Sequence, residues 1–243
     1  MMSISNKKVV IVGASSGIGK ELTRLYALAG CHVAITGRRN ALLDELKNKY
    51  PEHIITMPFD VMGNENIFHL ENIIKKLGGM DLFIYNSGYG EISKDLDWII
   101  DKATVLTNVN GFIEMTNYAF NYFVKQGQGQ IVGTSSIASL AGNPAAPAYS
   151  ASKAFMSIYL EGLYMKARKL RLPIAITDIQ PGFVKTKMAK GAGRFWEAPV
   201  EKASQQIYNA IEAKRFRVYI TKRWWLIAHL LKLLPGWLYR RLG

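Results

Sequence analysis

The sequence predicts an α/β fold: a doubly wound, parallel, seven-stranded sheet followed by a C-terminal helical extension. Short apolar runs rich in valine and isoleucine alternate along most of the chain with longer segments of helical character. The first run leads directly into a glycine-rich turn and a helix. Alternation of this kind forms a parallel sheet with right-handed crossovers. We expect one domain over residues 1–221, because 243 residues suffice for a single well-buried core, and an extension over residues 222–243.

The amino-acid composition indicates which broad class of protein this is. With 49% hydrophobic and 20% charged residues, the chain has the composition of a soluble globular protein. Its one cysteine, Cys31, excludes an internal disulfide and suits a reducing compartment, so we expect a cytoplasmic protein. The four histidines lack the spacing of metal ligands, which predicts that no metal is bound. The first eight residues are polar, and we expect no signal peptide.

The positive charge is concentrated near the C-terminus. The formal net charge is +13. From Lys185 to Gly243 the chain holds thirteen Lys and Arg against three Glu, and from Lys214 onward it holds eight basic residues and no acidic one. This asymmetry predicts an anionic partner for the C-terminal part: membrane lipid, acidic protein or nucleic acid.

The first predicted strand, residues 8–12, runs into Gly13, Gly17 and Gly19 and then a helix over 20–29 that ends at Gly30. Strand, glycine turn and helix in this order are typical of a Rossmann-type dinucleotide-binding fold. The glycines let backbone N–H groups approach a pyrophosphate, and the helix N-terminus adds the positive end of its dipole. A mere tight turn is the alternative interpretation.

The second predicted strand, residues 33–36, is followed by Gly37, Arg38 and Arg39. A fold that selects NAD would place an acid here for the ribose hydroxyls, whereas an arginine accommodates the 2′-phosphate of NADP. No acid stands between residues 36 and 40. We therefore expect NADP, with NADPH preferred over NADH, and Arg38 as the discriminating residue with Arg39 and Ser15 nearby; two solvated arginines are the alternative.

The remaining elements continue the alternation. We expect further strands at 54–58, 82–85, 130–134, 174–179 and 217–221, the last on the sheet edge, because each is a short apolar run bounded by polar or turn residues. Helices are predicted at 41–50, at 65–77 before a Gly-Gly pair, across a helical region at about 96–125, and at 149–170.

Tyr149 and Lys153 are four residues apart, so on a helix they lie on one face, one turn from each other. Free tyrosine has a pKa near ~10, and a neighbouring ammonium lowers that pKa by favouring the phenolate. The pair therefore predicts proton transfer to or from an oxygen. Ser136, at the end of the apolar run 131–134, can reach the same oxygen. An ordinary amphipathic turn is the alternative interpretation of the spacing.

Taken in order, these motifs resemble those of the short-chain dehydrogenase/reductase family over about residues 7–221. The glycine turn is similar to the family's cofactor turn, although Val12 stands where threonine is common. Residues 85–88, Tyr-Asn-Ser-Gly, stand where the family usually has Asn-Asn-Ala-Gly, so that Asn86 and Gly88 are kept. The resemblance implies a Rossmann-type, NADP-binding catalytic domain.

The resemblance also implies roles for individual residues. Ser136 would hydrogen-bond a substrate oxygen, Tyr149 would deliver the proton, and Lys153 would lower the tyrosine pKa and hold the nicotinamide ribose. Asn108 matches the family's active-site asparagine and would organise a water, with a structural amide as the alternative. Together with the residues named above, the expected cofactor-binding set is Gly13, Ser15, Ser16, Gly17, Ile18, Gly19, Arg38, Arg39, Asp60, Val61, Asn86, Gly88, Tyr149, Lys153, Pro181, Gly182, Val184 and Thr186.

Family members set their substrate with the loop after the sixth strand, here residues 187–199. This loop carries Met188, Phe195 and Trp196 among glycines and lysines, which we expect to contact substrate. Aromatic anchors beside flexible glycines suit a lid over an apolar substrate, and an ordinary mobile loop is the alternative. The family also commonly dimerises through its two long helices, so we expect a homodimer or tetramer.

The C-terminal extension is apolar around most of its circumference, with basic and aromatic residues at both ends. Its apolar run stops after eleven residues at Pro235, short of the about 20 that span a bilayer. The composition favours an interfacial anchor on anionic membrane, with a subunit-interface or core-covering helix as the alternative. Nucleic acid is the weaker candidate partner, because the extension is mostly apolar.

The function expected from these features is NADPH-dependent reduction of a ketone in a hydrophobic, lipid-like substrate. Two alternatives stay open at this point: a secondary-alcohol dehydrogenase that runs in the oxidative direction, and a non-catalytic, membrane-recruited dinucleotide sensor. The set of Ser136, Tyr149 and Lys153 argues against the sensor, because binding alone needs no proton donor.

Overall fold

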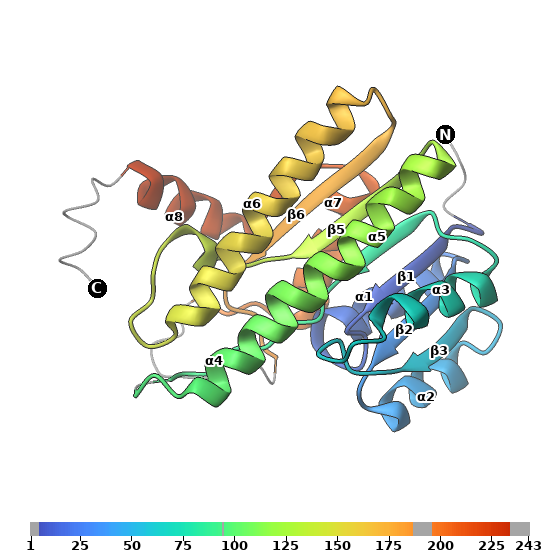
Figure 1. Cartoon of the computed structure of the whole chain (residues 1–243), viewed down its shortest axis with the longest axis horizontal. Coiled ribbons are helices and arrows are strands. Elements are labelled where there is room, and N and C mark those ends of the chain that lie inside the picture. Colours follow the sequence, from blue (N-terminus) through green and yellow to red (C-terminus); the bar gives the residue numbers. More distant parts are fainter. Residues whose placement is uncertain (1–4, 94, 187–195, 234–243) are drawn as a thin grey trace.

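The computed structural model describes residues 5–93, 95–186 and 196–233 of the chain (Figure 1). Its centre is a parallel sheet in the strand order β3-β2-β1-β4-β5-β6-β7. The strands are β1 (Lys8–Val12), β2 (His32–Gly37), β3 (Ile54–Pro58), β4 (Leu82–Tyr85), β5 (Gly129–Thr134), β6 (Ile174–Pro181) and β7 (Arg217–Ile220). The predicted doubly wound α/β fold is confirmed.

The point where the strand order reverses lies between β1 and β4. The chain winds from β1 outward through β2 to β3, then returns to place β4 on the other side of β1. Val12 accordingly pairs with Thr36 of β2 on one side and Tyr85 of β4 on the other. In open α/β sheets, ligands bind outside the carboxyl ends of the strands at such a point.

Helices cover both faces of the sheet (Figure 1). They are α1 (Gly17–Leu28), α2 (Asn40–Lys49), α3 (Asn66–Leu77), α4 (Trp98–Val105), α5 (Gly111–Gln126), α6 (Pro147–Lys169), α7 (Val200–Glu212) and α8 (Lys222–Leu233), with a π-helical turn η1 (Leu106–Asn110) and a 3₁₀ turn η2 (Ile137–Leu140). The buried clusters show that α3, α5 and α6 pack on one face and α1, α2 and α7 on the other.

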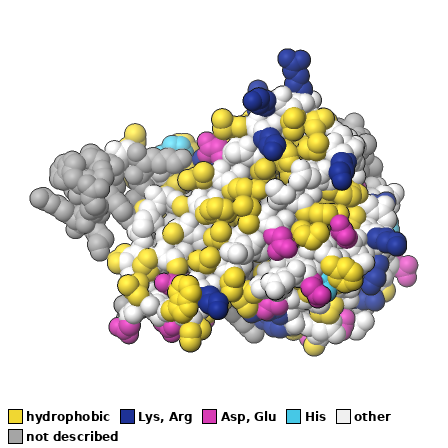
Figure 2. All heavy atoms as spheres, in the orientation of Figure 1, with side chains coloured by type: hydrophobic (Ala, Val, Ile, Leu, Met, Phe, Trp, Pro, Cys, Tyr) yellow, Lys and Arg dark blue, Asp and Glu magenta, His cyan; other side chains and the backbone are white. Residues whose placement is uncertain are grey.

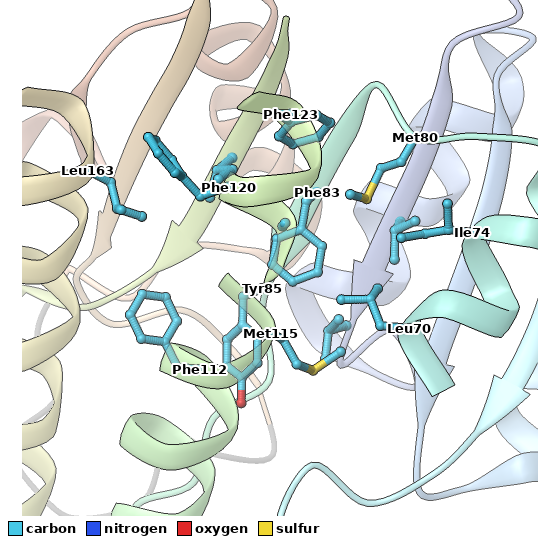
Figure 3. Close-up of a cluster of buried hydrophobic side chains, with 14 of the residues drawn as sticks. Leu70, Ile74, Met80, Phe83, Tyr85, Phe112, Met115, Phe120, Phe123 and Leu163 are labelled. Carbon is cyan, nitrogen blue, oxygen red and sulfur yellow. The ribbon is translucent and has the colours of Figure 1, made fainter. Parts of the chain in front are cut away.

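The two cores follow from the alternation of side chains along each strand. In β1, Val10 and Val12 face the cluster under α3, α5 and α6, whereas Val9 and Ile11 face the cluster under α1, α2 and α7. Figure 3 shows aromatic side chains of β4 and α5 filling the first cluster. Burial on both faces explains why the strands have nearly continuous apolar sequences.

The predicted elements agree with the structure to within one to three residues, with two corrections. The helical region expected over 96–125 is divided into α4, η1 and α5, and α4 begins only at Trp98. The helix α7 had no counterpart in the prediction, although its buried residues Ala203, Ile207 and Ile211 recur at helical spacing. Within the described residues, no helix has the length and apolar character needed to cross a membrane.

Candidate active site

The candidate site lies at the carboxyl ends of β1, β4 and β5, where Asn86 joins all three. Its backbone N–H donates to the Val12 carbonyl at 2.9 Å, and its side-chain Nδ2 donates to the Gly13 carbonyl at 3.1 Å. Its Oδ1 accepts a hydrogen bond of 3.1 Å from the Thr134 hydroxyl. One amide therefore fixes the glycine turn relative to the end of β5, and Gly88 lies two residues further along the same loop.

The glycine turn provides a cradle for an anion. Gly13 has φ +85° and lies so close to the next loop that a Cβ there would be 2.6 Å from Ser87 Cα. Gly17 has φ +55° and begins α1, of which Ile18 and Gly19 form the first turn. That first turn carries no acidic residue and no side-chain cap, so its N–H groups and the positive end of the helix dipole are available to a pyrophosphate. The residues present fit a dinucleotide.

The two arginines after β2 have different partners. Arg39 donates from Nη2 to the hydroxyls of Ser15 at 2.7 Å and Ser16 at 2.8 Å. Arg38 approaches Asp60 Oδ2 at 3.7 Å, and both of those side chains are exposed. Arg38, the predicted discriminator, thus lies beside Asp60, which with Val61 belongs to the expected cofactor-binding set. Arg39 instead makes the contacts to the glycine turn.

Tyr149 and Lys153 lie on one face of α6, as their spacing predicted, and the Lys153 ammonium is 5.7 Å from the centroid of the Tyr149 ring. Lys153 is buried and donates to the Thr134 carbonyl at 2.9 Å. The Ser136 hydroxyl accepts from the Ala138 N–H at 3.1 Å and donates to the Pro181 carbonyl at 3.5 Å. The end of β5 and the first turns of α6 therefore bring the three polar groups together.

Burial has the largest effect on the pKa values of Tyr149 and Lys153. It raises the pKa of the Tyr149 phenol above its ordinary value, while a hydrogen bond with Ser136 acts in the opposite direction. Burial also lowers the pKa of Lys153 to about 8, an effect that the Asp178 carboxylate opposes. The expected lowering of the tyrosine pKa by Lys153 is therefore not the dominant effect, and the phenol holds its proton at neutral pH.

Asn108 lies in the π-helical turn η1 and is fully buried. Its amide pairs with the backbone of Tyr89, accepting from the N–H at 2.8 Å and donating to the carbonyl at 2.7 Å. It also donates to the Ser152 hydroxyl at 2.9 Å, which in turn donates to the Tyr149 carbonyl at 2.7 Å. Asn108 therefore links the loop after β4 to the turn of α6 that carries Tyr149. π-Helical turns are frequent at functional sites.

Sequence reasoning missed Gly90 and Asp178. A Cβ at Gly90 would lie 2.2 Å from Tyr149 Cδ2, so the loop after β4 packs flat against the Tyr149 ring only because this residue is glycine. The carboxylate of Asp178 is completely buried in β6 and accepts hydrogen bonds from Ser135, Ser157, Gln180 and Arg217. An acidic residue inside an otherwise apolar strand was the signal that could have identified it.

The segment after β6 closes the other side of the site. It begins after Pro181, the last residue of β6, and contains Gly182, Val184 and Thr186; Val184 forms an isolated parallel bridge with Ala198. Thr186 faces the glycine turn, because a Cβ at Gly17 would lie 3.1 Å from its methyl group. Among the predicted substrate residues, Trp196 lies against Trp224 of α8, with ring centroids 6.2 Å apart. Met188 and Phe195 lie outside the described residues.

The sequence of residues 7–195 matches the family model described as short chain dehydrogenase. The chain belongs to the short-chain dehydrogenase/reductase family. It is 31% identical to an uncharacterised oxidoreductase of Mycobacterium tuberculosis over 99% of each chain. It is also 30% identical to the 3-oxoacyl-[acyl-carrier-protein] reductase FabG of Thermotoga maritima, over 88% of this chain and 86% of that protein. This short-chain dehydrogenase/reductase is thus an oxidoreductase.

Solved structures of short-chain dehydrogenases share the fold. One from Burkholderia cenocepacia, in complex with NADP, superposes with a TM-score of 0.84 at 21% identity over 99% of both chains. Another from Burkholderia phymatum, in complex with NAD, gives a TM-score of 0.80 at 18% identity over 95% of this chain and 94% of that one. At these identities the likeness concerns the fold alone, and a nicotinamide dinucleotide is the cofactor typical of the family.

Proposed function

We propose that this short-chain dehydrogenase/reductase uses NADPH to reduce a ketone of a hydrophobic, lipid-like substrate to a secondary alcohol. The observation that carries the direction is the Tyr149 phenol, whose pKa burial raises, so that it holds a transferable proton at neutral pH beside Ser136 and Lys153. A carbonyl reduction needs such a proton, whereas a dinucleotide sensor does not.

Ser136, Tyr149 and Lys153 have different roles in the proposed reduction. When bound, a reduced nicotinamide would supply the hydride that the carbonyl carbon receives. Ser136 donates a hydrogen bond to the carbonyl oxygen as negative charge develops on it, and Tyr149 donates its phenolic proton to the same oxygen. The C=O bond thereby becomes CH–OH, and the phenolate takes a proton back from solvent. The charge of Lys153 stabilises the phenolate in the interval.

Two structural features support the choice of NADPH as cofactor and of a hydrophobic substrate. The cluster of Arg38, Arg39, Ser15 and Ser16 supplies charge-assisted donors suited to a 2′-phosphate, which supports NADPH over NADH. The ring contacts of Trp224 with Phe183 and Trp196 border the segment after β6 with apolar surface, which supports a hydrophobic substrate.

The test is NADPH oxidation, followed at saturating cofactor, with a panel of 3-oxoacyl thioesters, long-chain lipid ketones and ketosteroids. The proposal expects turnover with at least one apolar member and little with short polar ketones. NADPH that binds tightly but is oxidised with no member of the panel, while the matching alcohols reduce NADP, would show that the oxidative direction is the activity.

A further inference from the structure

Helix α8 has one buried side and one exposed apolar side. Trp224 is 5% exposed and Ala228 is buried, whereas the neighbouring Trp225 is 54% exposed. Leu226, Leu230 and Leu233 are each more than half exposed. At 3.6 residues per turn, the four exposed side chains fall within an arc of about 140° on the side away from Trp224. We call Trp225, Leu226, Leu230 and Leu233 the outer face of α8.

The buried side of α8 is fixed against the active site. The Trp224 indole packs so closely on Gly182 that a Cβ there would lie 2.0 Å from Nε1, and its ring meets Phe183 at 5.5 Å between centroids. The helix also packs against η2, which follows Ser136. Figure 1 shows α8 at the outer end of the molecule, next to the loop that joins β5 to α6. Helix α8 therefore lies beside the substrate side of the site, and its outer face is turned away from the protein.

The basic residues around α8 indicate which kind of surface its outer face binds. From Lys214 to the C-terminus the sequence contains eight basic residues and no acidic one. Arg223, at the start of α8, lies over the Trp196 ring at 5.9 Å from its centroid and is itself exposed. An exposed tryptophan and leucines flanked by cationic side chains are typical of helices that lie in the interface of an anionic membrane. A nucleic-acid surface would be basic and polar instead.

We propose that α8 binds an anionic lipid surface through its outer face and so holds the active site against the membrane. A ketone dissolved in the lipid could then reach Tyr149 without crossing water. Delivery of the ketone from the lipid rests on the proposed function, whereas binding of α8 to the lipid surface does not. The binding is expected to have two parts: an electrostatic part that salt screens and an apolar part from Trp225 and the leucines that salt does not remove.

The binding step is tested by sedimentation of the full chain with vesicles of phosphatidylcholine alone or mixed with phosphatidylglycerol. The wild type should sediment with the mixed vesicles at low salt and partly leave them at high salt. The triple variant Trp225→Ser/Leu226→Ser/Leu230→Ser should lose at least about tenfold in partition, because it removes most of the apolar area available for insertion. Leu28→Ser, which removes an equally exposed leucine from α1, should bind like the wild type.

Other outcomes overturn the proposal. The proposal fails if the wild-type protein does not bind the mixed vesicles. It also fails if the triple variant binds them as well as the wild type does. A triple variant with a lower mass in light scattering would make the outer face a subunit interface, and one with a lower melting temperature would make it an internal packing surface. Arg223→Glu gives an independent check, since it should weaken binding to the mixed vesicles only. All of these readouts need no substrate, so they stand apart from the proposed reaction.

Discussion

Ser157 donates a hydrogen bond of 2.7 Å to Oδ2 of Asp178, and it lies one helical turn after Lys153 on α6. The same carboxylate accepts from the hydroxyl of Ser135, the residue before Ser136. A single buried acid on β6 therefore bonds to a residue next to Ser136 and to a residue one turn from Lys153, two of the three proposed catalytic residues. It also meets Arg217 of β7, whose second partner is Glu161 at 3.0 Å.

The first prediction concerns pH. Lys153, with its pKa lowered to about 8, is charged below that pH and neutral above it. Reduction needs the phenolic proton of Tyr149 and the positive charge beside it, so kcat/KM for the ketone at saturating NADPH should fall as pH rises through about 8. A reduction rate that increases with pH would contradict this assignment.

The second prediction makes Asp178 a positioning residue. Because its charge raises the pKa of Lys153, Asp178→Asn should move the alkaline fall in kcat/KM to lower pH. Glu161→Gln is the matched control, since it changes the exposed end of the same network and should leave the profile in place. If Asp178→Asn lowers activity equally at every pH, the carboxylate has only a structural role.

The third prediction concerns cofactor choice. Arg39→Ala and Arg38→Ala should each weaken NADPH binding by about 10- to 100-fold and leave NADH binding nearly unchanged, because the lost charge-assisted bonds would reach only the 2′-phosphate. Dissociation constants from the fluorescence of the reduced cofactors measure this. Arg24→Ala, which removes a cation paired with Glu21, is the control. Equal losses with both cofactors would show that these arginines do not discriminate.

The fourth prediction concerns assembly. The outward face of α6 carries Phe155, Ile158 and Met165 at helical spacing, all exposed, and Figure 2 shows apolar side chains along this side of the molecule. We expect a homodimer through this face. Ile158→Asp should reduce the mass in light scattering to that of one chain, whereas Leu28→Asp on the opposite layer should not. A wild type that is monomeric at working concentration would refute the prediction.

Much of the fold could be predicted from sequence because the signals are local. Buried parallel strands such as residues 9–12 are apolar on both faces, and Gly78 ends α3 in the left-handed conformation that glycine favours. The division of residues 96–125 was not predictable, because a π-helical turn inserts without any change in composition. The helix α7 was predictable, since its helical periodicity is present in the sequence.

The candidate site was predictable where spacing on one element determines contact, as for Tyr149 and Lys153. The partners that depend on tertiary packing were not. Nothing near Gly90 in the sequence indicates that it lies against Tyr149, and the pairing of Arg39 rather than Arg38 with Ser15 depends on how β2 ends beside the glycine turn. The direction of the Tyr149 pKa also escaped prediction, because burial is a property of the folded chain.

The variant Tyr149→Phe tests whether Tyr149 delivers the proton in an NADPH-dependent reduction. NADPH binding and turnover should be measured on the same preparation, with the best ketone of the panel. We expect an unchanged dissociation constant for NADPH and a loss in kcat of about 100- to 10,000-fold, since the ring stays and only the proton donor is removed. A variant that binds NADPH and keeps most of its kcat would show that another group donates the proton.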